Sequence, residues 1–160
     1  PPKGTVHVID DDLAMRESIE FLLSSANYDV QLYESAQAFL DATDVAFGCI
    51  LSDVRMPGID GLDLLKRLKA SGSKLPVLIM TAHGSIDDAV AAIQRGAFDY
   101  LTKPFNPEEL RARVTSSIDS TMIRPFIFEL PWTRSTKHTG SSTIFRWRSA
   151  LRTDISVWNT

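Results

Sequence analysis

Short apolar runs alternate with longer segments of helical periodicity through the first 120 residues of the chain. The runs are rich in Val, Ile and Leu, and the segments between them repeat apolar residues at the spacing of an amphipathic helix. We predict five strands, at residues 5–9, 28–33, 48–52, 75–80 and 98–102. We predict five helices, at residues 13–25, 35–42, 61–70, 85–96 and 107–118. This alternation indicates an α/β fold with a doubly wound parallel sheet.

Charge is distributed unevenly along the chain. Residues 1–120 contain 18 Asp and Glu against 11 Lys and Arg, a net charge of −7, whereas residues 121–160 contain 2 against 6, a net charge of +4. All three tryptophans lie in the second segment. We therefore expect a domain over 1–120 and an irregular C-terminal extension over 121–160 that is not an independent domain.

The extension at 121–160 contains no glycine-rich phosphate loop, helix-turn-helix pattern or sustained helical period. We interpret it as a native disordered extension, or as a truncated or frameshifted reading frame in place of an output domain. Its basic residues with interleaved aromatics are also found in nucleic-acid binding segments, which we treat as the less favoured alternative.

The chain contains one cysteine, Cys49, and no apolar run near the roughly 18 residues needed to span a bilayer. A single cysteine excludes an intrachain disulfide and fits a reducing compartment. The first residues show no charged-then-apolar signal pattern. These features predict a cytoplasmic protein with no membrane partner.

Polar and charged residues follow the predicted strands at the edge where a parallel α/β sheet binds ligands. Asp10 and Asp11 follow the first strand, Asp53 the third, Thr81 the fourth and Lys103 the fifth. Neighbouring carboxylates raise one another's pKa unless a cation lies among them. Clustered Asp residues suit Mg²⁺ better than Zn²⁺. A metal, a carboxylate, a hydroxyl and a lysine are together the equipment of phosphoryl transfer.

Each of these residues also has an ordinary structural explanation when it is considered alone. An Asp run after a strand is often a turn or a helix N-cap, and Asp12 fits the cap of the helix that begins at Leu13. An isolated lysine is usually a solvated charge, and threonine is a good strand former. Local propensity does not require all of them at four strand ends on one side of a sheet, so we interpret the set as a site.

Four motifs, in this order, resemble those of the receiver domain of bacterial two-component response regulators. They are Val8–Asp12, Leu51–Gly61, Met80–Gly84 and Gly96–Phe105. The resemblance covers roughly residues 4–120 and is greatest to receivers of the nitrogen-regulation, dicarboxylate-transport and nitrogen-fixation types. It implies a flavodoxin-like sheet of strand order 2-1-3-4-5 flanked by five helices.

The resemblance also implies a role for the acidic residues. Asp53 matches the phosphoacceptor, whose carboxylate takes the phosphoryl group from the phosphohistidine of a sensor histidine kinase. Asp10 and Asp11 match the acidic pair that holds Mg²⁺, together with Asp53 and the main-chain carbonyl of Arg55.

Three further roles follow from the same resemblance. Lys103 matches the lysine that pairs with a phosphoryl oxygen, and its bond to Pro104 is expected to be cis. Thr81 matches the switch hydroxyl, and Tyr100 matches the aromatic residue whose ring moves inward when Thr81 is drawn toward the phosphate.

We therefore predict a response regulator that catalyses its own phosphorylation and dephosphorylation, has no external substrate and controls an output, in the first place transcription. Its expected partners are a histidine kinase and a second copy, bound through the helix at 85–96, the strand at 98–102 and the helix at 107–118. DNA would be contacted only through an output domain that this chain does not display.

Two alternatives remain open from the sequence. One is a stand-alone receiver that acts by protein contact. The other is an aspartate-nucleophile phosphohydrolase of the haloacid dehalogenase type, whose second Asp stands two positions after the nucleophile. This chain has Arg55 at that position, which counts against the second alternative.

Overall fold

The computed structural model describes residues 1–42, 45, 47–82 and 85–128, with side chains described as far as Met122. Five parallel strands form one sheet of order β2-β1-β3-β4-β5, which confirms the predicted fold and strand order. The strands are β1 (Thr5–Ile9), β2 (Asp29–Tyr33), β3 (Cys49–Asp53), β4 (Val77–Ala82) and β5 (Asp99–Lys103). The chain winds outward from β1 to β2 and then crosses to β3 on the other side of β1. This change of direction leaves a crevice at the carboxyl ends of β1 and β3, where ligands bind in such sheets.

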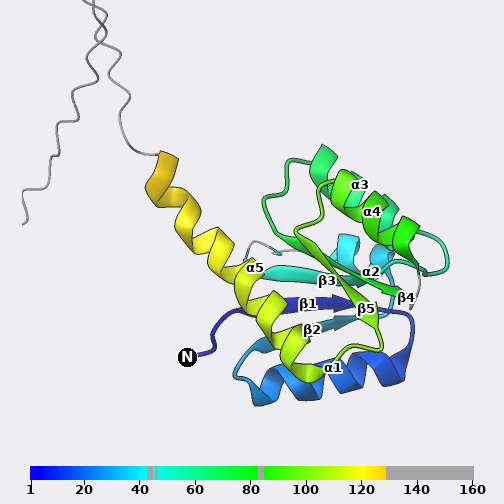
Figure 1. Cartoon of the computed structure of the whole chain (residues 1–160), viewed down its shortest axis with the longest axis horizontal. Helices are drawn as coiled ribbons and strands as arrows, with labels where there is room; N and C mark the ends of the chain where they lie inside the picture. Colours follow the sequence, from blue (N-terminus) through cyan, green and yellow to red (C-terminus); the bar gives the residue numbers. More distant parts are fainter. Residues whose placement is uncertain (43–44, 46, 83–84, 129–160) are drawn as a thin grey trace, which may run out of the picture. The chain divides into compact units, whose positions relative to one another are not determined.

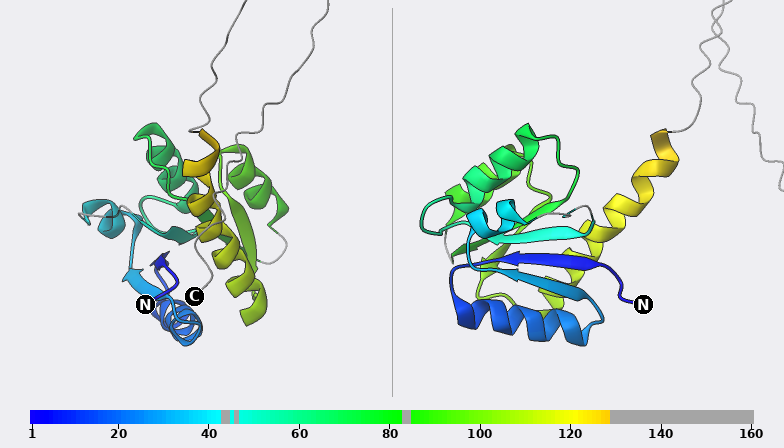
Figure 2. Two further views of the ribbon diagram at one scale, coloured as in Figure 1. Left: turned by 90° about the vertical axis from the view of Figure 1, so that its left-hand side faces the viewer. Right: turned by 180° about the vertical axis from the view of Figure 1, so that it is seen from behind.

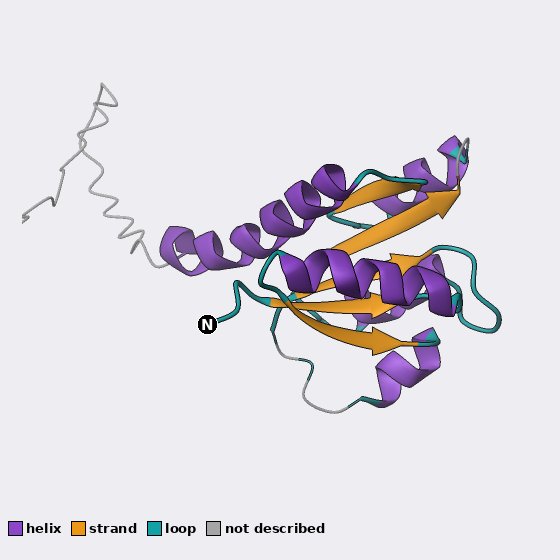
Figure 3. Cartoon of the chain, turned by 90° about the horizontal axis from the view of Figure 1, so that it is seen from below, coloured by secondary structure: helices purple, strands orange, loops and turns teal. Residues whose placement is uncertain are grey.

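Helices cover both faces of the sheet (Figure 1). They are α1 (Leu13–Ser25), α2 (Ala36–Asp41), α3 (Gly61–Ala70), α4 (Ile86–Gln94) and α5 (Pro107–Phe128). The views from behind and from below place α1 and α5 on one face and α2, α3 and α4 on the other (Figures 2 and 3). Alternation along each strand directs successive side chains to opposite faces, so the sheet contributes to two separate cores.

Each core joins one face of the sheet to its own helices. On the first face, Ile19 and Leu23 of α1 and Leu110 and Val114 of α5 pack against alternate residues of the strands. On the second face, side chains of α2, α3 and α4 pack against the intervening residues. The members from the helices are Ala36, Phe39, Leu64, Leu65, Leu68 and Ala92. Burial of each such large side chain stabilises the fold by roughly 1.5–3 kcal/mol, and the two cores together hold the strand ends in place.

The helix that leads away from β1 begins where its cap predicts. The carboxylate of Asp12 accepts a hydrogen bond from the amide of Ala14 at 2.9 Å, and α1 starts at Leu13. At the start of α5, the Asn106 side chain accepts one from the amide of Glu109 at 2.6 Å. Both caps satisfy amides that have no partner within the helix.

Most predicted bounds differ from the observed ones by at most two residues, and two elements, β4 and α5, show a physical reason for the difference. β4 runs over Val77–Ala82 rather than 75–80, because Pro76 has no amide hydrogen for the ladder while the last two residues of β4 pair with the last two of β5. α5 continues to Phe128, ten residues beyond the predicted end at 118 and through the expected boundary near 121. Apolar periodicity indicates which turns of a helix pack on the sheet. Among the side chains that the structure describes, Ile118 is the last of α5 in the core, while the helical backbone continues to Phe128.

The expected extension therefore begins as helix in its first eight residues, 121–128. Residues 129–160, with the three tryptophans, lie outside the described residues, as does His83 in the loop after β4. Among the described residues, no helix has both the length and the apolar character needed to cross a membrane.

Candidate functional site

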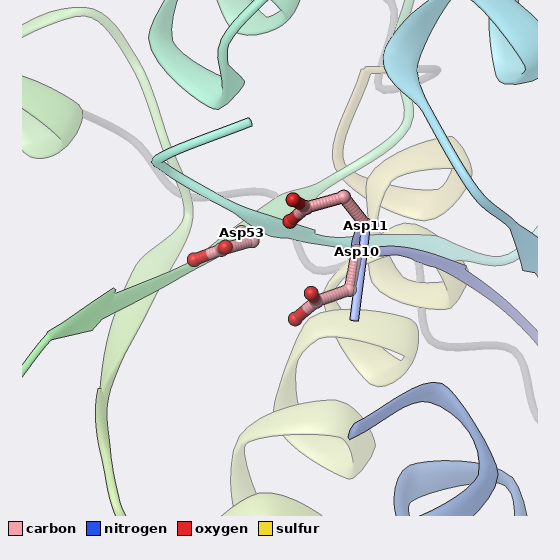
Figure 4. Close-up of side chains that lie close together, drawn as sticks. All are labelled: Asp10, Asp11 and Asp53. Atoms are coloured by element: carbon pink, nitrogen blue, oxygen red, sulfur yellow. The ribbon is translucent and has the colours of Figure 1, made fainter. Parts of the chain in front are cut away.

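Three carboxylates meet at the crevice between β1 and β3. Asp10 and Asp11 directly follow β1, and Asp53 is the last residue of β3. The register of the two strands pairs Ile9 with Ser52, so their ends lie side by side. One oxygen from each carboxyl group lies within 4.8 Å of the other two. Figure 4 shows Asp10 and Asp11 projecting toward the side on which Asp53 lies.

Asp10 is fully buried, and each of its polar atoms has a partner. Its amide donates to the carbonyl of Tyr33, at 3.2 Å. One carboxylate oxygen accepts from the amide of Asp12 at 2.9 Å, and the other from the ammonium of Lys103 at 2.8 Å. Its main-chain carbonyl accepts from the guanidinium of Arg16 at 2.7 Å. A buried carboxylate needs hydrogen-bond and ion-pair partners for its oxygens, because an unpaired buried charge costs several kcal/mol.

The ammonium group of Lys103, at the end of β5, forms ion pairs with Asp10 after β1 and with Asp53 at the end of β3. Its ammonium nitrogen lies 2.8 Å from an Asp10 oxygen and 3.3 Å from an Asp53 oxygen. Burial alone would lower the pKa of Lys103, but hydrogen bonds and Coulomb attraction to the two carboxylates outweigh it, and the net pKa is raised. Lys103 therefore stays protonated in a site that is only partly open to water.

Burial has the dominant effect on Asp53 and raises its pKa above the ordinary value. Lys103 opposes this rise, while the negative charges of Asp10 and Asp11 add to it. One ammonium thus stands against three carboxylates, and the site retains excess negative charge. An electrostatic arrangement of this kind favours the entry of a cation.

The donor set fits Mg²⁺. All three groups offer hard carboxylate oxygens, and Asp11 is exposed, which leaves the outer side of the cluster open for water or phosphate oxygens. Mg²⁺ binds through a small number of carboxylates and keeps several such exchangeable ligands. Within the part of the chain that the structure describes, no cysteine or histidine belongs to the cluster, so these donors do not favour Zn²⁺.

The described contacts of the Thr81 and Tyr100 side chains are made to residues other than the three carboxylates. Thr81 is buried in β4, and its hydroxyl donates to the carbonyl of Leu101 in β5 at 3.5 Å. Tyr100 is 36% exposed, and the guanidinium carbon of Arg113 lies 6.0 Å from the centre of its ring. The structure therefore places the two predicted switch residues on or next to β5, and among the described residues neither side chain is hydrogen-bonded to Asp10, Asp11 or Asp53.

The Arg55 side chain pairs with a carboxylate outside the cluster of Asp10, Asp11 and Asp53. Its guanidinium, with a side chain that is 76% exposed, pairs with Asp88 in the first turn of α4 at 3.1 Å. Ser85 donates to the same carboxylate. The hydrogen bond from Ser85 is the larger cause of the lowered pKa of Asp88. Only the main-chain carbonyl of Arg55 is then a predicted ligand, at the start of the loop after β3.

The bond Lys103–Pro104 is cis, as the resemblance implied. Arg16, by contrast, is a site neighbour that the sequence analysis missed. Its one signal in the sequence is its place in the first turns of α1, where a positive charge faces the positive end of the helix dipole.

The fold and the carboxylate cluster define a receiver. The sequence profile described as "Response regulator receiver domain" matches residues 6–115. Because this match covers more than half of the chain, the protein belongs to the response regulator receiver domain family.

Its relatives include regulators of transcription. The chain is 56% identical over 117 residues to the transcriptional regulatory protein FixJ of Bradyrhizobium diazoefficiens, covering 72% of this chain and 57% of that one. It is 46% identical over 117 residues to the DNA-binding transcriptional regulator NtrC of Klebsiella pneumoniae, covering 72% of this chain and 25% of that one. The crystal structure of full-length FixJ from B. japonicum superposes with a TM-score of 0.74 at 51% identity, covering 79% of this chain and 63% of that one. The chain thus spans little more than half the length of these FixJ relatives.

Proposed function

We propose that this receiver accepts a phosphoryl group on Asp53 from the phosphohistidine of a sensor histidine kinase in a Mg²⁺-dependent reaction. The observation that carries the proposal is the convergence of Asp53, Asp10, Asp11 and Lys103 at one crevice of the sheet. We propose further that the chain has no external substrate and catalyses only its own phosphorylation and dephosphorylation.

The proposed reaction is a transfer between two nucleophiles. A carboxylate oxygen of Asp53 attacks phosphorus, and the bond between phosphorus and the histidine nitrogen breaks. The electron pair of that bond stays on the imidazole, and Asp53 becomes an acyl phosphate. Attack by water on phosphorus then releases inorganic phosphate and restores the carboxylate.

The residues around Asp53 have distinct tasks in this reaction. Lys103, already 3.3 Å from an Asp53 oxygen, pairs with a phosphoryl oxygen. Asp10, Asp11, Asp53 and the main-chain carbonyl of Arg55 are the proposed ligands of Mg²⁺. When bound, this ion offsets negative charge on the phosphoryl oxygens.

Phosphorylation adds about −2 of charge and three acceptor oxygens beside Lys103. We propose that Thr81 turns its hydroxyl from Leu101 toward these oxygens, and that Tyr100 follows inward. A change of this kind biases a two-state element. Here the element is the face of α4, β5 and α5.

This face is suited to contact with another protein. Ile86, Val90 and Ile93 of α4 and Tyr100 of β5 are exposed, and they line a cavity of about 310 Å³. We propose that a second copy binds there. Arg113 pairs with Asp99 and Glu109 within the same chain, and exposed pairs of this type are worth only about 0–1 kcal/mol, so the apolar residues supply most of the contact energy.

We propose transcription as the output, on the basis of the relatives named above, with DNA contacted through an output domain rather than through the receiver. We also propose a cytoplasmic location, where a receiver meets the phosphorylated histidine of its kinase.

Labelling with radioactive acetyl phosphate in the presence of Mg²⁺ tests the nucleophile. The wild-type chain is expected to form an acyl phosphate, and Asp53→Asn is expected to form none, because an amide cannot attack phosphorus. Asp12→Asn is the matched control: Asp12 caps α1 and is not in the cluster, and asparagine caps a helix equally well. Equal labelling of Asp53→Asn and wild type would contradict the assignment.

A further inference from the structure

We propose that Arg16 is a positioning residue of the metal site: by holding the main-chain carbonyl of Asp10, its guanidinium aims the Asp11 carboxylate at Asp53. The inference rests on the proposed function, because it concerns the same Mg²⁺ ligands. It assigns a task to a side chain that neither binds the metal nor touches the phosphoryl group.

The loop between β1 and α1 consists of three residues, Asp10 to Asp12. The side chains of its first and last residues are anchored, Asp10 to Lys103 and Asp12 to the amide of Ala14. Among the described residues, the Asp11 carboxylate has no hydrogen-bond partner. Its direction is therefore set by the backbone on either side of it.

Within the described ranges of the chain, Arg16 supplies the side-chain hydrogen bond to the main-chain carbonyl that precedes Asp11. The Arg16 Nη1 atom lies 2.7 Å from the carbonyl oxygen of Asp10, a short charge-assisted bond in a half-buried setting. This carbonyl belongs to the peptide group that links Asp10 to Asp11. Rotation of that peptide group would swing Asp11 away from its two partners, and the bond from Arg16 opposes the rotation.

The position of Arg16 is unfavourable for α1 itself. A cation near the N-terminus of a helix faces the positive end of the dipole, at a cost of roughly 0.3–1 kcal/mol. No acidic residue stands in the first turn, and the N-cap carboxylate of Asp12 accepts a hydrogen bond from the amide of Ala14 rather than from Arg16. Helix stability therefore does not account for Arg16, whereas its bond to the Asp10 carbonyl does.

The direction in which Mg²⁺ affinity changes when Arg16 is replaced distinguishes a positioning role from a purely electrostatic one. Arg16 is a positive charge near a cation site, so its charge alone repels Mg²⁺. If charge were its only effect, removing it would strengthen Mg²⁺ binding. If it positions Asp11, removing it weakens binding, by about tenfold for an outer partner of a metal ligand.

The test is calorimetric titration of MgCl₂ into the full unphosphorylated chain, with melting temperature as the measure of folding. Arg16→Gln is expected to bind Mg²⁺ about tenfold more weakly than wild type. Arg16→Lys is expected to regain part of this loss, because an ammonium still donates to a carbonyl. Arg95→Gln, the same change at an exposed residue of α4's C-terminal cap, is the charge control and is expected to bind as wild type.

Equal or tighter Mg²⁺ binding by Arg16→Gln would overturn the inference, and so would a lower melting temperature with unchanged affinity, which is the pattern of a purely structural residue. Should the Gln variant fail to fold, Arg16→Ala replaces it with the same expectation, since alanine is the best helix former. A wild-type chain that neither binds Mg²⁺ nor forms an acyl phosphate would instead refute the proposed function.

Discussion

Replacing Lys103 with methionine removes the cation that, among the described residues, contacts the carboxylates of Asp10 and Asp53, while keeping a similar volume. Lys103 is 2.8 Å from Asp10, which is fully buried, and 3.3 Å from Asp53. Without it, two carboxylates face each other in a partly desolvated crevice. We therefore expect Lys103→Met to destabilise the metal-free protein and to increase its response to Mg²⁺.

The size of the effect follows from the geometry. At an effective dielectric constant of about 20, charges at these separations attract by roughly 6 and 5 kcal/mol. Desolvation costs several kcal/mol per ion and offsets most of this gain. Removing one partner of a buried pair costs about 3–5 kcal/mol. Because the Lys103 side chain is 20% exposed, we expect the lower end, a loss of about 3 kcal/mol in the free energy of unfolding.

The difference between variant and wild type depends on pH. It requires ionised Asp53 and protonated Lys103. It therefore shrinks as the pH falls through the raised pKa of Asp53, and in the wild type it is lost as the pH rises through the pKa of Lys103, which lies above its ordinary 10.5. The largest difference is expected between these two limits.

Urea unfolding at neutral pH, with and without MgCl₂, measures this prediction. Mg²⁺ at 100 times the wild-type dissociation constant adds about 2.7 kcal/mol to the stability of the wild type. At the same Mg²⁺ concentration the gain is expected to be larger in the variant, whose site lacks the competing ammonium. Lys66→Met, at an exposed position of α3, is the control and is expected to change stability by less than about 0.5 kcal/mol. A Lys103→Met variant as stable as Lys66→Met, with the same response to Mg²⁺, would refute the reasoning.

Two other outcomes can be measured on the same chain. Gly61→Ala would place a Cβ atom 2.2 Å from the carbonyl oxygen of Asp53, so the loop after β3 must shift. We expect a loss of about 2–3 kcal/mol in the free energy of unfolding by urea, together with slower labelling by acetyl phosphate. Wild-type values for both would show that the loop tolerates the added methyl group. Burial lowers the pKa of His7, whose ring lies against Tyr33 and the carbonyl of Phe47. The unfolded chain then binds the extra proton first, so stability is lost as the pH falls below about 6.5 toward the lowered pKa. His7→Gln is expected to lose this part of the pH dependence of stability. Parallel pH profiles of the free energy of unfolding for wild type and variant would rule out the contribution of His7.

Most of the fold was predictable because its signals are local. The helices at 13–25 and 61–70 begin and end where periodicity and caps place them. The boundary of β4 was not predictable in the same way, because pairing with β5 rather than apolar character decides which residues belong to it. The predicted end of α5 coincides with Ile118, the last of its described side chains in the core, whereas the helical backbone continues to Phe128.

The residues that form the site were easier to predict from the sequence than the hydrogen bonds and ion pairs that they make. The sequence places acidic residues after the first and third strands, and the register of β1 and β3 brings them within reach of one another. The orientation of Thr81 toward Leu101, and of Arg55 toward Asp88, has no local signal. Both depend on which neighbouring element packs beside them.

Local sequence specifies the kinds of elements, their order and the residues at the strand ends, because strand and helix periodicity and capping depend on residues close together in the chain. The balance of charge at the crevice, by contrast, depends on contacts between residues far apart in the chain. Lys103 reaches Asp10 across 93 residues of sequence, and Arg16 reaches the Asp10 carbonyl only because α1 turns back onto β1. Contacts of this kind require the packed sheet and its helices, since no local preference brings a lysine, an arginine and a buried carboxylate to one point.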